Sequence, residues 1–294
     1  MSGILLILTV ILCIACYTGQ TFFNKLFSLS YPGTAEQATP VFAGIYGGLV
    51  AFVTLCLSGF RFAPSGLTWL LGGFNGIILF LYNLGMIQAA RRGPYAFQSI
   101  VMLFGSIVVC LVFSAAFWGD RITILQLCGI AVMLAAFVVF NCGGLKFSNI
   151  KKGYFFWVIS LFLTNGFYGV LMDAQQRMAG SERNEMIVIT FAASALVSLL
   201  YLAVTQKGRA PEAFRMGKKA GACAVISSLC AAFAVFVLML LLAYIPSYVL
   251  YTVNNGSILV LSALLCAAVL KEKLTRETYI GIALSVVSLI MLSV

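Results

Sequence analysis

The sequence is divided into long stretches that contain no charged side chain, and this pattern limits the possible folds more than any other feature. The stretches free of Asp, Glu, Lys and Arg are 1–24, 37–60, 62–90, 93–119, 122–145, 153–172, 186–206, 220–270 and 278–294. A helix that rises 1.5 Å per residue needs about 20 apolar residues to cross the hydrocarbon core of a bilayer. Eight stretches have the length of one crossing and one has the length of two. The pattern therefore predicts ten transmembrane helices.

The double-length stretch 220–270 contains the segment Tyr244-Ile245-Pro246-Ser247. Proline is favoured in the first turn of a helix, so we expect one helix to end before this segment and another to begin in it. No basic segment precedes the first apolar stretch, so we expect this stretch to be the first spanning helix rather than a cleaved signal peptide.

Composition indicates that the solvent around these helices is lipid. Of the 294 residues, 62% are hydrophobic and 9% are charged, whereas about a quarter of the residues of a soluble protein are charged. The net charge of +10 arises from Lys and Arg at the ends of apolar stretches, which is typical of membrane anchoring and not of nucleic-acid binding. We therefore expect the bilayer as a partner and no nucleic acid.

The residue types also limit the chemistry. The chain has no histidine, which excludes imidazole metal ligands and histidine general bases. All nine cysteines, including the Cys13–Cys16 CxxC pair, lie within apolar stretches, where free cysteine behaves as a small apolar residue. An intramembrane enzyme would have to use Asp173 or scattered cysteines. We therefore expect neither an enzyme nor a cofactor nor a metal site.

An internal repeat appears when the chain is shifted by 152 residues. Pro94 then aligns with Pro246, Asp120-Arg121-Ile122-Thr123 aligns with Glu272-Lys273-Leu274-Thr275, and Gly129 aligns with Gly281. The threonine of each matching turn is expected to cap the next helix, and the acids Asp120 and Glu272 to favour its N-terminus. The halves 1–145 and 146–294 are therefore predicted to be two five-helix repeats.

Five is an odd number, so the second repeat is expected to enter the membrane from the opposite side to the first. Inverted repeats of this kind are typical of secondary transporters, whose substrate sites lie near the membrane midplane. Within the helices we expect close packing at the small-residue pairs Gly44 with Gly48 and Gly72 with Gly76.

The chain resembles the drug/metabolite transporter superfamily, and within it the EamA-like group. The resemblance rests on the repeated order of a proline, an acid-x-x-Thr turn and a glycine, and on the segment from Tyr17 to Lys25, with Tyr17 where tryptophan is usual. It implies a ten-helix carrier with a central cavity lined by the first four helices of each half, while the fifth helices are peripheral. The superfamily moves amino acids, sugars, nucleotide-sugars and drugs, so the resemblance leaves the substrate open.

Polar side chains inside membrane helices are costly and tend to face a cavity or another helix. Twelve polar residues of the first, third, fourth, sixth and ninth predicted helices are the candidate substrate-binding residues. They are Tyr17, Gln20, Asn24, Asn75, Tyr82, Asn83, Gln98, Asn165, Tyr168, Tyr251, Asn254 and Asn255. The alternative is that these groups only bond to neighbouring helices. For Asn254 and Asn255 we expect substrate contact, because adjacent amides break the symmetry of the repeat, where Met102 and Leu103 stand at the matching positions.

The predicted function is secondary transport, without ATP, of a small neutral or zwitterionic metabolite such as an amino acid, by alternating access. No acid lies deep in a predicted span; Asp173 and Glu36 are the nearest. The alternatives are a lipid flippase or scramblase and a non-transporting receptor. We expect a multi-pass protein of the plasma membrane, in particular the bacterial inner membrane, as a monomer or a homodimer.

The distribution of charge predicts the orientation. If the N-terminus were cytoplasmic, the cytoplasmic loops would carry Arg61, Arg121, Arg177 and Arg183, and the other 14 of the 18 basic residues would lie outside. Since basic residues favour the cytoplasmic side, both termini are predicted to be outside, although cytoplasmic termini are usual in the family that the chain resembles.

Overall fold

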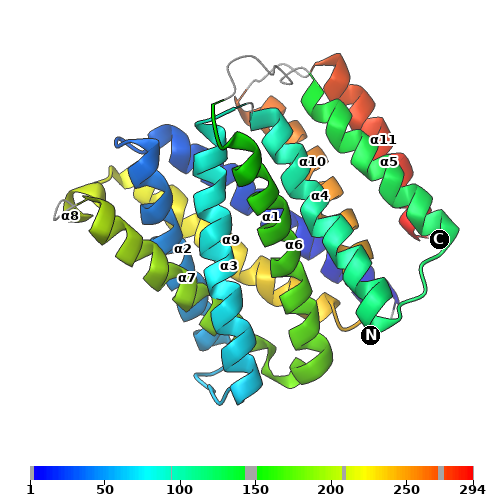
Figure 1. The fold of residues 1–294 in the computed structure, drawn as a ribbon, viewed down its shortest axis with the longest axis horizontal. Coiled ribbons are helices and arrows are strands. Elements are labelled where there is room, and N and C mark those ends of the chain that lie inside the picture. The colour runs from blue at the N-terminus through cyan, green and yellow to red at the C-terminus, as the bar shows by residue number, and fades with distance from the viewer. Residues whose placement is uncertain (1–2, 94, 143–150, 207–209, 271–274, 294) are drawn as a thin grey trace. The chain divides into compact units, whose positions relative to one another are not determined.

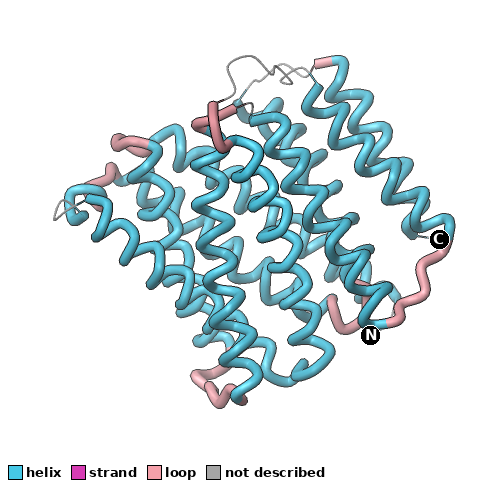
Figure 2. Tube along the Cα trace, viewed as in Figure 1, coloured by secondary structure: helices cyan, strands magenta, loops and turns pink. Residues whose placement is uncertain are grey.

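A computed structural model describes residues 3–93, 95–142, 151–206, 210–270 and 275–293. Helices make up nearly all of these residues, and short loops connect them (Figure 2). No strand occurs in this part of the chain. The all-helical class predicted from the sequence is therefore confirmed.

Seven helical stretches within the described ranges are long and apolar enough to cross a membrane. They are Gly3–Ser30, Gln37–Leu57, Gly66–Ala89, Phe97–Trp118, Tyr154–Gln206, Lys218–Leu241 and Ser247–Val269. The stretch Tyr154–Gln206 has 53 residues, and Ile124–Phe140 is a shorter apolar helix. The number of such stretches is smaller than the ten predicted helices, because two consecutive helices merge into the 53-residue stretch and the 18-residue helices Ile124–Asn141 and Arg276–Ser293 are not among the seven.

Large apolar side chains are exposed on the helices, while many polar side chains are buried. Ile124 is 81% exposed and Val204 is 76% exposed, whereas Asn75 and Gln98 are fully buried. A soluble protein shows the opposite distribution. The protein is a multi-pass helical membrane protein.

The described chain forms two compact units, and each unit combines segments from both halves of the sequence. Unit 1 contains residues 1–83 and 171–243, and unit 2 contains residues 84–170 and 244–294. The boundary between the units falls within two helices, α3 (Gly66–Ala90) and α6 (Tyr154–Ala179). The units therefore do not coincide with the sequence halves 1–145 and 146–294.

Unit 1 is built from α1, α2, α7, the short α8, α9 and the parts of α3 and α6 that lie in its residue ranges. Their bounds are α1 Gly3–Ser30, α2 Ala35–Leu57, α3 Gly66–Ala90, α6 Tyr154–Ala179, α7 Arg183–Gln206, α8 Ala210–Ala213 and α9 Lys218–Leu241. A 3₁₀ turn, Gly180–Glu182, joins α6 to α7. Helix α6 extends beyond the charge-free stretch that predicted it and includes Asp173 and Arg177.

Helices α1 and α9 pack against each other in antiparallel directions. The Cys13 thiol lies 3.6 Å from the Ala234 carbonyl oxygen, and the Ser227 hydroxyl donates to the Gln20 carbonyl oxygen at 3.0 Å. Between these contacts, a Cβ atom added to Gly19 would lie 3.3 Å from the Cys230 sulfur. The small residue at position 19 therefore permits the close approach of the two helices.

Glycines also govern the packing of α2 against α7. A Cβ atom on Gly44 would lie 2.7 Å from the Leu199 side chain, and one on Gly47 would lie 2.6 Å from the Phe191 carbonyl oxygen. A Cβ atom on Gly48 would meet no atom within 4 Å. The predicted pair Gly44 with Gly48 is therefore wrong at its second member, because the helical turn places Gly47 and not Gly48 on the face toward α7.

The second predicted glycine pair is confirmed in the contact between α3 and α7. A Cβ atom on Gly72 would lie 2.9 Å from the Ile189 side chain, and one on Gly76 would lie 2.7 Å from the Thr190 carbonyl oxygen. The Thr190 hydroxyl in turn donates to the Gly72 carbonyl oxygen at 3.3 Å. The position of α3 against α7 depends on both glycines.

Unit 2 is built from α4, α5, α10, α11 and the remaining parts of α3 and α6. The bounds are α4 Tyr95–Phe113, α5 Ile124–Asn141, α10 Ser247–Leu270 and α11 Arg276–Ser293, with a π-helical turn at Ser114–Trp118 after α4. Helices α5 and α11 lie side by side (Figure 1). The Ser288 hydroxyl donates to the Gly129 carbonyl oxygen at 2.6 Å, and a Cβ on Gly281 would meet the Phe140 ring.

The helix starts that the sequence predicts are found in the structure. Thr123 caps α5, because its side chain accepts from the Gln126 amide at 3.2 Å while the Gln126 side chain accepts from the Thr123 amide. The Pro246 carbonyl oxygen accepts from the amides of Val249 and Leu250 at the start of α10. The Thr278 amide donates to the Thr275 hydroxyl at 3.4 Å, and Glu272 lies outside the described residues.

The helix starts recur at a constant interval. The starts of α3, α4 and α5, at Gly66, Tyr95 and Ile124, are followed 152 residues later by the starts of α9, α10 and α11, at Lys218, Ser247 and Arg276. The interval equals the shift that aligns the two halves of the sequence.

Candidate functional site

The twelve predicted site residues divide between the units. Unit 1 contains Tyr17, Gln20, Asn24, Asn75, Tyr82 and Asn83, and unit 2 contains Gln98, Asn165, Tyr168, Tyr251, Asn254 and Asn255.

In unit 1, Gln20 forms a polar contact between α1 and α2. Its amide nitrogen donates to the Tyr46 hydroxyl at 3.1 Å. Its amide oxygen is buried without a hydrogen-bond partner in the described chain. The Tyr46 ring lies in edge contact with Phe191 of α7, with ring centroids 5.6 Å apart. Tyr46 was not among the predicted site residues, because α2 carries no row of polar residues that marks it.

Asn75 is the other notable residue of unit 1. It lies on α3 between Gly72 and Gly76, and its side chain is fully buried. Both its amide nitrogen and its amide oxygen are buried without a hydrogen-bond partner among the described residues. A carboxamide offers two donors and an acceptor, and leaving such groups unpaired costs about 1–3 kcal/mol. A solute or a water that pairs with this amide would remove the cost.

Helix α7 carries a buried polar row that the sequence interpretation missed. Thr190, Ser194 and Ser198 are spaced by four residues and are each at most 2% exposed. The Ser198 hydroxyl is also buried without a partner in the described residues. The spacing i, i+4, i+8 is a recognisable signal for one helix face, and it was visible in the sequence.

The remaining predicted residues of unit 1 are less enclosed. Asn24 is exposed, while Tyr17, Tyr82 and Asn83 are half-buried. Asn24 follows Gln20 by one turn of α1 toward the end of the helix. The structure therefore does not bring Asn24 into the buried part of its unit.

In unit 2, two of the predicted asparagines donate to α4. The Asn165 amide of α6 donates to the Met102 carbonyl oxygen at 2.8 Å, and the Asn255 amide of α10 donates to the Ser106 hydroxyl at 2.9 Å. Met102 and Ser106 are one turn apart on α4. These amides hold α6 and α10 against α4.

Gln98 makes a similar contact at the start of α4. It is fully buried, and its amide nitrogen donates to the Met86 carbonyl oxygen of α3 at 3.0 Å. Its amide oxygen is buried without a partner in the described part of the chain. Tyr168 is half-buried on α6, and Asn254 is only 5% exposed on α10.

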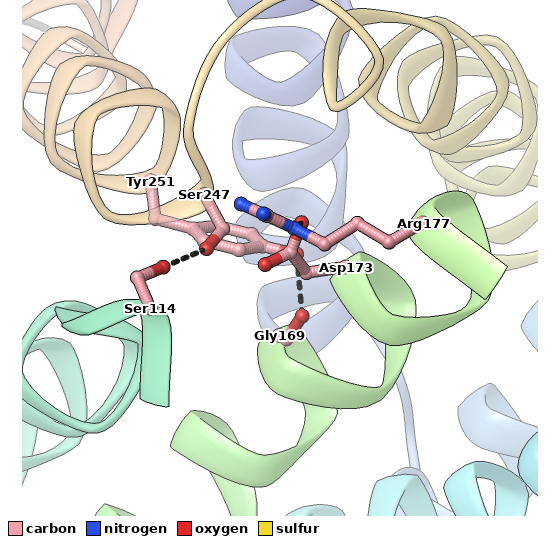
Figure 3. A network of polar contacts seen from close by, with 6 residues as sticks. All are labelled: Ser114, Gly169, Asp173, Arg177, Ser247 and Tyr251. Carbon is pink, nitrogen blue, oxygen red and sulfur yellow. Dashed lines mark hydrogen bonds and ion pairs between the residues drawn. The ribbon is translucent and has the colours of Figure 1, made fainter. Parts of the chain in front are cut away.

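Two further bonds involve the start of α10, and Figure 3 shows both. The hydroxyls of Ser247 and Ser114 lie 3.2 Å apart, and the Tyr251 hydroxyl lies 3.5 Å from the Gly169 carbonyl oxygen of α6. Ser114 begins the π-helical turn, an irregularity that is frequent at functional sites. A Cβ atom at Gly169 would lie 3.0 Å from the Tyr251 ring, so the glycine permits this contact.

One buried acid lies on α6. Asp173 is 2% exposed, and the Arg177 guanidinium donates to its carboxylate at 3.1 Å across one helical turn (Figure 3). Charged residues in membrane helices are commonly functional. The pairing gives Asp173 a local counter-charge.

A second acid, Glu182, lies in the turn between α6 and α7. One oxygen of its carboxylate accepts from the Ser65 amide at 2.8 Å, from the Ser65 hydroxyl at 2.8 Å and from the Thr68 hydroxyl at 2.5 Å. The Thr68 hydroxyl also accepts from the Gln175 amide at 2.9 Å. The hydrogen bonds from Thr68 and then from Ser65 lower the pKa of Glu182. This network ties the start of α3 to the end of α6.

The buried polar side chains of both units are thus mostly amides and hydroxyls. Such groups recognise a neutral solute, or the polar ends of a zwitterion, by hydrogen bonds that both donate and accept. Among the twelve predicted residues, Gln20, Asn75 and Gln98 carry amide atoms that lack a partner in the described residues, and these are the candidates for solute contact.

Comparison with known proteins supports the fold. No protein-family model matches the chain, and no curated protein matches it. A solved structure described as "Crystal structure of protein" matches with a TM-score of 0.79 and 17% identical residues, over 99% of this chain and 98% of that chain. Likeness at this identity extends to the fold alone, which is therefore one that an experimentally determined structure also adopts.

Proposed function

We propose that the protein is a secondary transporter that carries a small neutral or zwitterionic metabolite across the membrane by alternating access. The proposal includes ten membrane crossings in two inverted five-helix repeats, and membership of the drug/metabolite transporter superfamily. The observation that carries it is that helices equivalent under the 152-residue shift contact each other in antiparallel directions.

Three pairs of equivalent helices make such contacts: α2 with α7, α4 with α10 and α5 with α11. In the second pair, Ser114 contacts Ser247 and Ser106 contacts Asn255, so the residue numbers rise on one helix as they fall on the other. Repeats inserted in the same direction would make equivalent helices run parallel. Antiparallel pairs are expected when the second repeat is inverted.

The remaining helices support the same relation. Gly19 of α1 contacts Cys230 of α9. Under the 152-residue shift, Gly19 is equivalent to Leu171 of α6, and Cys230 is equivalent to Ile78 of α3. This position lies between two observed contacts of α6 with α3, Gln175 with Thr68 and Leu161 with Gly85. The two helix pairs thus share an antiparallel register to within about one turn.

Helix length supports the proposed number of crossings. The 53-residue helical stretch Tyr154–Gln206 would be about 80 Å long as one straight helix, whereas a bilayer core is about 30 Å thick. The 3₁₀ turn at Gly180–Glu182 divides it into α6 and α7, each long enough for one crossing. Helices α5 and α11, with 18 residues each, supply two further short crossings.

The proposed solute class is supported by buried amide atoms that have no partner in the described residues. The Asn75 amide and the Gln20 amide oxygen are uncharged and buried in unit 1, and they match a solute that both donates and accepts hydrogen bonds. Bacterial inner membrane is the proposed location, by analogy with the superfamily that the sequence resembles.

The proposal is tested by thermal stabilisation of the purified protein with a panel of neutral, zwitterionic and charged metabolites. A ligand that binds only the folded state raises its stability, and we expect neutral or zwitterionic amide-bearing compounds to raise the melting temperature most. Stabilisation by organic cations alone would contradict the proposed solute class.

A lipid flippase or scramblase is tested in the same preparation. Vesicles with a fluorescent lipid in both leaflets are treated with an impermeant quencher. Loss of more than the outer half of the fluorescence in protein-containing vesicles would replace the proposal with a lipid-handling function.

A further inference from the structure

We infer that the end of α3 and the start of α6 form a binding site for the phosphate headgroup of an anionic phospholipid. The site, called the basic cluster below, consists of Arg91, Arg92, Lys151 and Lys152. The inference is independent of transport, because it concerns a surface and not the solute path.

The fold brings these four residues together although they are about 60 positions apart in the sequence. The Lys151 amide donates to the Arg92 carbonyl oxygen at 2.8 Å. Gly93 packs against Tyr154, whose ring would lie 2.6 Å from a Cβ atom at position 93. Two pairs of adjacent cations therefore lie at one end of unit 2, held by a backbone hydrogen bond and a close glycine contact.

The sequence around the basic cluster is free of acids over long stretches. No acidic residue occurs in 37–119 or in 121–172. Lys151 and Lys152 are exposed beside Arg92. Cations gathered at one surface favour an anionic partner, and each contributes about fivefold to affinity for an anionic lipid surface.

Aromatic side chains place the basic cluster at the membrane surface. The Arg92 guanidinium lies 5.9 Å above the Trp157 ring and donates to the Gln88 carbonyl oxygen at 2.8 Å. Phe155 and Phe156, in the same first turn of α6, are 52% and 68% exposed. Tryptophan and exposed apolar rings at a helix end are typical of the lipid interface. A phospholipid fits both parts, because its phosphate meets the cations while its acyl chains cover the rings.

A fixed guanidinium distinguishes this site from basic residues that only anchor a helix. Arg92 is held by Trp157 and by Gln88, whose side-chain oxygen also accepts from it. A positioned guanidinium can donate two parallel hydrogen bonds to a phosphate. The match is therefore to a phosphate group and not merely to a negative surface.

The test uses Trp157 as the reporter in the full chain. Trp69→Phe and Trp118→Phe leave Trp157 as the single tryptophan of the three. This variant is reconstituted in phosphatidylcholine vesicles that contain a tenth of phosphatidylglycerol, with bromine, a tryptophan quencher, on the acyl chains of one lipid or of the other. We expect brominated phosphatidylglycerol to quench Trp157 far beyond its share of the lipid.

The double variant Lys151→Gln/Lys152→Gln should have an affinity for phosphatidylglycerol, relative to phosphatidylcholine, that is about twenty- to thirtyfold lower. High salt should lower the same relative affinity in the unchanged chain. The matched control is Lys218→Gln with Lys219→Gln, two exposed lysines at the start of α9 in unit 1, which should leave the quenching of Trp157 unchanged. Native mass spectrometry of the unmodified chain should show retained phosphatidylglycerol that the Lys151/Lys152 variant loses.

Three results would overturn the inference. One is quenching of Trp157 in proportion to lipid composition, and another is an unchanged preference in the Lys151/Lys152 variant. The third is complete loss of the preference when millimolar glycerol phosphate is added, since a free phosphate would then be the ligand instead of a lipid.

Discussion

At the scale of single residues, burial of the Asn75 amide has a cost in folding free energy. Its side chain is fully buried on α3, and both polar atoms of its amide lack a partner in the described residues. An apolar residue at this position would avoid the cost of about 1–3 kcal/mol. In the proposed function, a solute pairs with this amide during transport.

Replacing Asn75 with leucine should stabilise the empty protein and weaken solute binding. The melting temperature without ligand should rise by a few degrees, because the unpaired amide is gone. Affinity for the transported solute should fall by about ten- to hundredfold. The measurement is thermal unfolding of the purified protein with and without ligand.

Asn165→Leu is the matched control, because the Asn165 amide is paired with the Met102 carbonyl oxygen. This change should lower the melting temperature. If Asn75→Leu destabilises the protein as much as Asn165→Leu does, the Asn75 amide holds helices together instead of binding a solute.

Glu182 makes a pH-dependent contribution to stability. Its pKa is lowered from the ordinary value of 4.5 by the hydrogen bonds from Thr68 and Ser65. The stabilisation is therefore full above about pH 4.5 and is lost as the pH falls through the lower folded-state value. We expect the chain to melt at a higher temperature than Glu182→Gln at pH 7, and the difference to vanish in acid. A difference that stays constant down to pH 3 would contradict this assignment.

Residue types could be predicted better than their contacts. The sequence indicated Gln20, Asn75 and Gln98 as polar groups in membrane helices, but not which amide atoms have partners, because this depends on the rotation of each helix. Tyr46 was missed since its partner Gln20 lies on another helix.

At the scale of helices, glycines set how closely pairs approach. In Gly47→Ala, the new methyl group would clash with the Phe191 carbonyl oxygen. Helices α2 and α7 must then separate, which lowers the stability of the protein by about 1–3 kcal/mol. Gly48→Ala meets no atom within 4 Å and gains helix propensity. The melting temperature should fall in the first variant and be unchanged or higher in the second. Equal melting temperatures would show that α2 and α7 do not pack as described.

Helix starts could be predicted where a local signal specifies them. Thr123 and Pro246 mark the starts of α5 and α10 through their own bonds to the first turn. Absence of charge was a weaker guide to helix ends, because α6 continues through Asp173 to Ala179. The Asp173–Arg177 pair, four residues apart, allows the helix to include both charges.

For the whole molecule, the arrangement of the helices was the least predictable feature. The repeat predicts two halves, 1–145 and 146–294, whereas each compact unit combines segments of both. Contacts such as Cys13 with Ala234 join residues 221 positions apart. They depend on complementary packing between helices, which no local pattern encodes.

Orientation in the membrane is tested with a fluorescent reporter, active only in the cytoplasm, fused to the C-terminus. With the proposed ten crossings, fourteen of the 18 basic residues fall on one side of the membrane, and this side should be cytoplasmic. The basic cluster belongs to it. The reporter should therefore stay dark in cells that produce the protein. A bright reporter would place both termini in the cytoplasm and contradict the charge-based orientation.

Transport by the purified protein is the most direct test of the central claim. Vesicles that contain the protein are loaded with an unlabelled solute that stabilises it, then diluted into a trace of the labelled solute. A secondary carrier should accumulate the label transiently without ATP, and the Asn75→Leu variant should accumulate much less. Asp173→Asn should reduce accumulation without abolishing it, since a neutral solute does not require that charge. If a solute that binds the protein never exchanges across the vesicle membrane, the protein is a receptor and not a transporter.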